Sequence, residues 1–213
     1  MQDQKLVLPA NVQKSVGLPT PKTGVPILGC SIAEYTGLIK LWAQDRNLIE
    51  GSSFSKQSSK LLEEVGEMSR HINKGKPVTD DIGDVIVVVT ILCAIVGLDV
   101  ENYIPKTILE PTKLEMDKDQ LLAMINLGCS SLAVCQFQNN LKDSVHGMAH
   151  VILGLFEALG AMAEKHDANV RDCLEEAYNE IKDRKGRMID GKFVKEADLS
   201  VAVKDQLEAE LNA

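Results

Sequence analysis

Residues 60–89 have the sequence KLLEEVGEMSRHINKGKPVTDDIGDVIVVV. Apolar residues at spacings of three and four, interrupted by the Gly75–Pro77 turn, predict a helix over about 55–73 and a second, antiparallel helix over about 80–97. Carboxylates three or four residues apart share one face of a helix. The hairpin is therefore expected to bring two acidic groups together, Glu63, Glu64 and Glu67 on the first helix and Asp81 and Asp84 on the second, with Asp80 nearby.

Carboxylates that converge on one groove repel one another strongly unless a cation neutralises them. Oxygen ligands are those that Mg²⁺ and Mn²⁺ prefer, and Mg²⁺ is commonly shared with substrate phosphates. A Glu-Glu-x-x-Glu pattern alone is more typical of a solvated acidic face. The second acidic group, however, runs directly into the apolar segment Val85–Val89, where a solvated face is not expected. We therefore favour a metal site.

The composition indicates a globular domain. The chain has 213 residues, of which 45% are hydrophobic and 25% charged, which is enough for a sizeable core. A net charge of -8 argues against a protein that binds nucleic acid through bulk positive charge. The five scattered cysteines form no Cys-x-x-Cys pair, and the N-terminus shows no signal pattern. We expect reduced thiols, a cytoplasmic location and no membrane span.

The remaining pattern is helical, which predicts an all-α bundle. Ser31 and Glu34 have capping-box spacing at the start of a helix that fades near 45–47. Further helices are expected over about 118–139, 142–166 and 168–185, with a short element over 99–104 and a loop over 187–198. Prolines and glycines make 1–30 an extended arm, and 200–213 is a tail, so the domain spans 31–199.

A weak internal repeat relates two helical hairpins. At an offset of 68 residues, the segment 59–104 aligns with 127–172, and Asp99 aligns with Asp167. The second copy lacks the carboxylates of the first. We expect two stacked hairpins in a four-helix arrangement, with a metal-binding half over about 31–104 and a degenerate half over about 118–185.

The acidic motif resembles that of a known family. Glu63-Glu64-Val65-Gly66-Glu67, followed after thirteen residues by Asp81-Ile82-Gly83-Asp84, is similar to the EExxE and ExxD pattern of MazG-like all-α NTP pyrophosphohydrolases, with Asp81 in place of the usual Glu. The segments 41–46, 57–61 and 175–195 also look like parts of that family, many members of which are phage-encoded. The two-copy arrangement is similar to that of dimeric dUTPases in the same superfamily.

The resemblance implies cleavage of a (d)NTP between its α and β phosphates, giving a monophosphate and pyrophosphate. It implies Mg²⁺, with Mn²⁺ as a substitute, bound by Glu63, Glu64, Glu67, Asp81 and Asp84. One of Glu63 and Glu64 is instead a candidate base for the attacking water, and the sequence does not choose between them. The base is open as well: dGTP in a phage is one substrate, and dUTP or dCTP another. Homodimers or homotetramers are implied, because a second helical hairpin closes the groove in the family.

Six further residues are substrate-binding candidates: Lys56, Lys60, Lys182, Arg184, Trp42 and Asn102. The basic side chains suit phosphates, but Lys182 and Arg184 are equally compatible with a solvated helix end. For the neighbouring Lys185, Arg187, Lys192 and Lys195 we favour the solvated interpretation. Trp42 suits a core position slightly better than a base-stacking one. The alternatives to this enzyme are a non-catalytic helical protein with a vestigial acidic groove and a hydrolase of another pyrophosphate bond.

Overall fold

The chain folds as a bundle of α-helices, which confirms the predicted all-α class. The computed structural model describes residues 26–105, 108, 114–135, 137 and 141–199, with side chains omitted over 141–146. Residues 1–25 of the predicted arm over 1–30 and the whole predicted tail over 200–213 lie outside the described residues. The elements are α1 (Ile32–Asp45), α2 (Phe54–Asn73), α3 (Thr79–Ile95), the 3-10 turn η1 (Val100–Tyr103), α4 (Lys118–Cys135), α5 (Leu141–Glu164), α6 (Val170–Ile181), β1 (Gly186–Ile189), β2 (Lys192–Lys195) and the 3-10 turn η2 (Glu196–Asp198).

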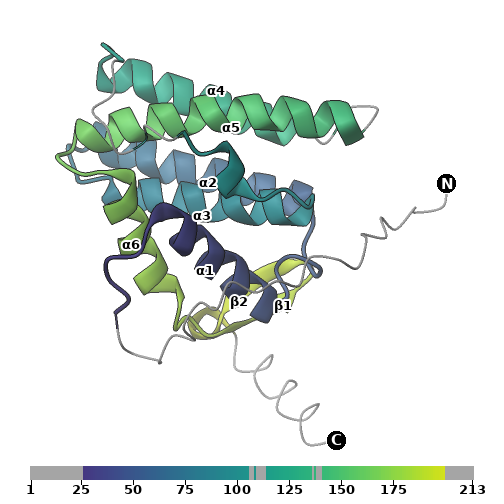
Figure 1. Ribbon diagram of the computed structural model, residues 1–213. Helices are drawn as coiled ribbons and strands as arrows, with labels where there is room; N and C mark the ends of the chain where they lie inside the picture. Colours follow the sequence, from purple (N-terminus) through teal and green to yellow (C-terminus); the bar gives the residue numbers. More distant parts are fainter. Residues whose placement is uncertain (1–25, 106–107, 109–113, 136, 138–140, 200–213) are drawn as a thin grey trace, which may run out of the picture.

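The helices lie in three layers (Figure 1). α2 and α3 form the middle layer, α4 and α5 pack over one side of it through α2, and α1 and α6 pack over the other side against α3. The β1–β2 hairpin lies beside α1, below the middle layer in Figure 1. The α2–α3 and α4–α5 hairpins are the two stacked hairpins that the sequence predicts. Their proposed common origin stays an interpretation.

α3 is the centre of the core because almost every one of its side chains is buried. Thirteen of its 17 residues are buried, including the β-branched run Val85–Val89. Length and flanking turns therefore outweigh the strand preference of these residues. A helix that is apolar all round has to be enclosed by neighbours, and α1, α2 and α6 enclose it.

α3 and α6 approach each other very closely at Gly83. A β-carbon on this residue would lie 2.4 Å from the carbonyl oxygen of Cys173 and 2.6 Å from the β-carbon of Ala177, both on α6. Only glycine allows that contact. Gly83 thus fixes the separation of the two helices, and α6 leads directly into the β-hairpin.

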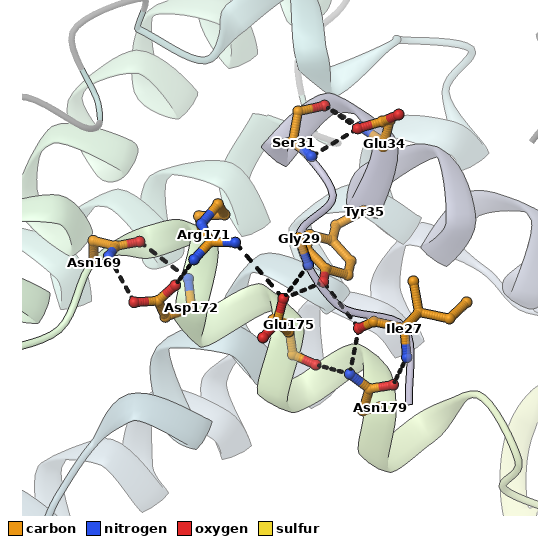
Figure 2. Close-up of polar contacts among 10 residues, drawn as sticks. All are labelled: Ile27, Gly29, Ser31, Glu34, Tyr35, Asn169, Arg171, Asp172, Glu175 and Asn179. Atoms are coloured by element: carbon orange, nitrogen blue, oxygen red, sulfur yellow. Dashed lines mark hydrogen bonds and ion pairs between the residues drawn. The ribbon is translucent and has the colours of Figure 1, made fainter. Parts of the chain in front are cut away.

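The segment before α1 is also attached to α6 (Figure 2). The backbone N–H of Ile27 donates to Asn179 Oδ1 at 2.7 Å, and Asn179 Nδ2 donates back to the Ile27 carbonyl at 2.8 Å. Glu175 accepts bonds from the Gly29 N–H at 2.8 Å and the Tyr35 hydroxyl at 2.6 Å. These bonds hold the start of α1 on α6. The predicted capping box of Ser31 and Glu34 is confirmed.

The predicted loop over 187–198 is wrong, because this segment contains an antiparallel hairpin. Ile189 pairs with Lys192, so the turn consists of Asp190 and Gly191 alone. Both have positive φ, 49° and 73°, as a type I′ turn requires. α6 also ends earlier than expected, at Ile181 instead of 185.

Two further expectations concern cysteines and membranes. All five cysteines are free, and Cys93, Cys129, Cys135 and Cys173 are buried, as predicted. Within α5, Gly147–Glu164 has the length and hydropathy of a membrane span, but 56% of it is buried inside the fold. A core helix of a globular protein has the same character.

We predict that Gly83→Ala destabilises the fold. The added methyl group clashes with the backbone of α6, which cannot move aside by a side-chain rotation. The free energy of unfolding should therefore fall by about 1–3 kcal/mol. Urea unfolding measures this. Gly66→Ala is the matched control: a β-carbon there meets no atom within 4 Å, and alanine at an exposed helical position should raise stability by about 0.5–1 kcal/mol. Equal effects of the two substitutions would contradict the close α3–α6 contact.

Candidate functional site

One cavity of about 590 Å³ lies between α2, α3, α6 and the β-hairpin. We call it the carboxylate cavity. Its acidic lining residues are Glu63, Glu64, Glu67, Asp80, Asp84, Glu180 and Asp198; its basic ones are Lys56, Lys60, Arg184, Lys192 and Lys195; and its other residues are Trp42, Leu48, Gln57, Ser59, Val87, Val88, Ile91, Ile181, Phe193 and Val194. Among the described residues, α4 and α5 contribute none to the lining. The wall opposite α2 comes from α6 and the hairpin instead.

Glu64 is the most buried carboxylate of the cavity, with a side chain only 8% exposed, whereas that of Glu63 is 62% exposed. Lys60 Nζ lies 2.7 Å from Glu64 and 3.1 Å from Glu63, one turn earlier on α2. Burial lowers the pKa of Lys60, but its bonds to Glu64 and Glu63 outweigh that effect and raise it overall. Glu67 pairs with Arg70 at 3.1 Å. Lys60 is thus the cation that balances the pair of glutamates.

Asp84 faces Glu64 across the cavity from α3. The pKa of Asp84 is raised to about 7, first by burial and then by the charges of Glu64, Asp80 and Glu180, while the charge of Arg184 opposes the rise. The Asp84 carboxyl is therefore held where its charged form is poorly stabilised. Such perturbed carboxyls cluster at functional sites.

Asp80 lies one helical turn before Asp84 and also lines the cavity. Its pKa is raised to about 6, first by burial and then by the charges of Glu180, Glu176 and Asp81. Its Oδ1 atom is buried without a hydrogen-bond partner among the described residues. Asp80 and Glu180 therefore add to the negative potential of the site. The sequence predicts Asp80 near the metal ligands but not among them, and it gives no indication of Glu180.

Three of the predicted site residues do not line the cavity. Asp81 is buried and bonds to His71 Nδ1 through both carboxylate oxygens, at 3.0 and 2.8 Å. The Lys182 side chain is only 5% exposed, and its Nζ lies 3.5 Å from Asp183. Asn102 is exposed on η1. On α3, the rotation of the helix, which spacing alone does not determine, turns Asp80 and Asp84 toward the cavity and Asp81 toward His71.

The other predicted residues do meet there. Glu63, Glu64, Glu67 and Asp84 share the cavity with Lys56, Lys60, Arg184 and Trp42. Arg184 pairs with Glu180, four residues earlier. Trp42 is only 7% exposed and belongs to the core, and it also lines the cavity, so its stacking on a nucleotide base stays a prediction. Its indole N–H has no hydrogen-bond partner in the described structure.

The residues present suit a divalent cation in their chemistry. All the candidate ligands are carboxylates, which Mg²⁺ and Mn²⁺ prefer. Their charges oppose one another, as the raised pKa values of Asp80 and Asp84 indicate. Within the described residues, no three acidic, His or Cys side chains stand close enough to share one ion. Glu64 and Asp84, on facing helices, are the two buried enough to gain most from a cation between them.

Comparison with known proteins gives one relative. No family model matches the chain, and no solved structure matches it. The chain is 50% identical over 56 residues to an uncharacterized 18.2 kDa protein from the rep-hol intergenic region of Haemophilus phage HP1 (strain HP1c1). The match covers 25% of this chain and 34% of the relative, so this chain spans about a third of the relative's length. The relative is phage-encoded, and its name gives no activity.

We predict that the metal-free protein loses stability as pH rises from about 4 to about 7. The pKa of Asp84 in the folded protein, about 7, lies above its ordinary value of 3.8, so the folded protein retains a proton that the unfolded chain releases. The carboxyl of Asp80 adds to the same slope between about pH 4 and 6. Thermal unfolding in EDTA across this range measures the effect.

Asp84→Asn should flatten that slope. At pH 8, we expect the substitution to raise the free energy of unfolding by about 1–3 kcal/mol, because it removes a charge that burial and three carboxylates oppose. Glu157→Gln, at an exposed position on α5, is the control and should change stability by less than about 0.5 kcal/mol. If Asp84→Asn instead lowers the free energy of unfolding at pH 8, the charged form of Asp84 does not destabilise the folded protein and the account of this carboxyl is wrong.

Proposed function

We propose that this protein is a Mg²⁺-dependent nucleoside triphosphate pyrophosphohydrolase, cleaving a (d)NTP to the (d)NMP and pyrophosphate. The supporting observation is the carboxylate cavity, which sets two acidic helices opposite basic side chains around an apolar floor. Its volume of about 590 Å³ suits a ligand of nucleotide size. The resemblance of the acidic motif to the MazG-like pattern is the second support.

In this proposal Glu64 and Asp84 hold the metal, with Glu63, Glu67 and Asp80 around them. A bound Mg²⁺ would neutralise phosphate charge and lower the pKa of an attacking water. Lys60, which pairs with Glu64, would then be available to bind the phosphates. Glu63 is the more exposed of the adjacent pair, which suits a base that accepts a proton from water, and Glu64 suits a ligand. Asp81 lies outside the cavity lining, and its hydrogen bond to His71 ties α3 to α2.

The substrate and setting are proposed more coarsely. Trp42, Phe193 and Ile91 give the cavity an apolar side that suits the purine or pyrimidine ring of a nucleotide. The phage-encoded relative is compatible with control of a nucleotide pool in the cytoplasm of an infected host, with dGTP, dUTP and dCTP as candidates. A homodimer or homotetramer remains part of the proposal. Neither nucleic acid nor a membrane is required.

A second candidate is a non-catalytic interaction protein. The observation that favours it is the outer face of α4, where Leu127 is 68% exposed and Val134 59%, followed by Phe137 at 76%. Exposed apolar side chains in a row are typical of contact surfaces. In that case the acidic cavity is a vestige without turnover.

We predict that the wild-type protein hydrolyses at least one nucleotide of a panel of ribo- and deoxynucleoside triphosphates, detected as phosphate released by added pyrophosphatase. EDTA should abolish turnover, and Mg²⁺ or Mn²⁺ should restore it. Glu64→Gln should lower kcat/KM by at least about 100-fold without changing the far-ultraviolet circular dichroism. Glu101→Gln, at an exposed position on η1, should retain full activity.

Two results separate the candidates. The absence of turnover with every nucleotide, in a folded wild-type protein that also binds no Mn²⁺, favours the interaction protein. Turnover that survives Glu64→Gln places the active site elsewhere.

A further inference from the structure

We propose that the β1–β2 hairpin is the polyphosphate-binding wall of the carboxylate cavity, and that Lys192 and Lys195, together with Lys56 of α2, bind the phosphates of the nucleotide. This inference rests on the proposed function, because it assigns a role to the same cavity. The sequence pattern alone favoured solvated roles for both hairpin lysines.

Contacts before β1, at the turn and within β2 hold the hairpin in place. Arg46 donates from Nε to the Arg184 carbonyl and from its terminal nitrogen to the Lys182 carbonyl, both at 3.0 Å. The guanidinium of Arg46 also lies 4.9 Å from the Trp42 ring centre. These contacts hold the connection between α6 and β1 against α1.

The far end of the hairpin is attached to the start of α2. Ser52 Oγ donates to the Gly191 carbonyl at 2.7 Å, and Gln57 Nε2 donates to Ser52 Oγ at 3.0 Å. In β2, the Phe193 ring packs edge-on against Trp42, with ring centres 6.0 Å apart. A hairpin anchored at its base, middle and tip presents its lysines at defined positions, as binding requires.

Lys56 completes the basic wall by lying over the hairpin turn. A β-carbon on Gly191 would lie 2.8 Å from Lys56 Nζ and 3.0 Å from its Cδ. Lys56, which lines the cavity, therefore lies against the hairpin turn, although Gly191 follows it by 135 positions in the sequence. Glycine at position 191 allows the positive φ of the turn, and it also leaves room for the Lys56 side chain beside the turn.

Charge pairing distinguishes these lysines from the other cavity cations. Lys60 is bound to Glu63 and Glu64, and Arg184 to Glu180. Lys56, Lys192 and Lys195 line the same cavity and form no ion pair with the described part of the chain. Cations that converge on a shared space without an internal anion favour an external one.

The carboxylates that line the same cavity limit which anions the lysines can bind. A simple anion would meet the carboxylates of Glu64 and Asp84 and be repelled. A polyphosphate that carries a divalent cation presents both signs of charge, and it satisfies both walls at once. Lys185 and Arg187, which flank or belong to the same hairpin but do not line the cavity, take no part.

The test is equilibrium binding of two non-hydrolysable analogues, α,β-imido-dUTP and α,β-imido-dGTP, to the full-length protein by calorimetry in Mg²⁺. Lys192→Ala and Lys195→Ala should each weaken binding of at least one analogue about tenfold, and the double variant about 100-fold. The double variant should also show a smaller dependence of log Kd on log salt. Lys192→Arg with Lys195→Arg should restore most of the affinity.

The double variant Lys185→Ala with Arg187→Ala removes the same charge from the hairpin outside the cavity, and it should bind within about twofold of wild type. Equal weakening in this control, wild-type binding by the Lys192 and Lys195 double variant, or no binding by the wild type would each overturn the inference. Lysine-dependent binding without any hydrolysis would uphold it and defeat the proposed enzyme.

Discussion

The fold depends on α3, a helix that is apolar on nearly every side and therefore has to be covered on every side. Burial of an aliphatic side chain contributes about 1.5–3 kcal/mol, so the packing around Val85–Val89 dominates the arrangement of the chain. α2, α1 and α6 provide the cover. The contact with α6 is close enough that Gly83 admits no side chain, and it sets the separation of α3 from the helix that leads into the β-hairpin.

The same packing holds acidic groups together at the first turns of α3. Asp80 and Asp84 emerge there beside Glu64 and Glu180, partly shielded from water, and their pKa values rise to about 6 and about 7. The packing of the core holds these carboxylates together despite their repulsion. Arg184 relieves the repulsion at Asp84 only in part, and Lys60 pairs with the α2 glutamates. Functional sites commonly hold carboxylates of like charge close together, where a bound ligand supplies the cation that neutralises them.

The sequence predicted the helices well but the site only in part. Spacing identified the hairpin of α2 and α3 and the cap at Ser31, because these depend on local pattern. It could not tell Asp80 from Asp81, since both lie about one turn from Asp84. The rotation of α3 decides between them, and contacts with α6 and His71 set that rotation. The β-hairpin was missed although Asp190-Gly191 is a hairpin signal, because its short strands depend on packing against α1.

The most direct test of the account follows the phosphorus atoms of the substrate. A ³¹P NMR time course of each deoxynucleoside triphosphate with wild-type protein and Mg²⁺ identifies the products without coupling enzymes. The account predicts that at least one nucleotide gives only the signals of a nucleoside monophosphate and pyrophosphate, and that EDTA prevents their appearance. Formation of a diphosphate and orthophosphate, or unchanged spectra for every base, would contradict it.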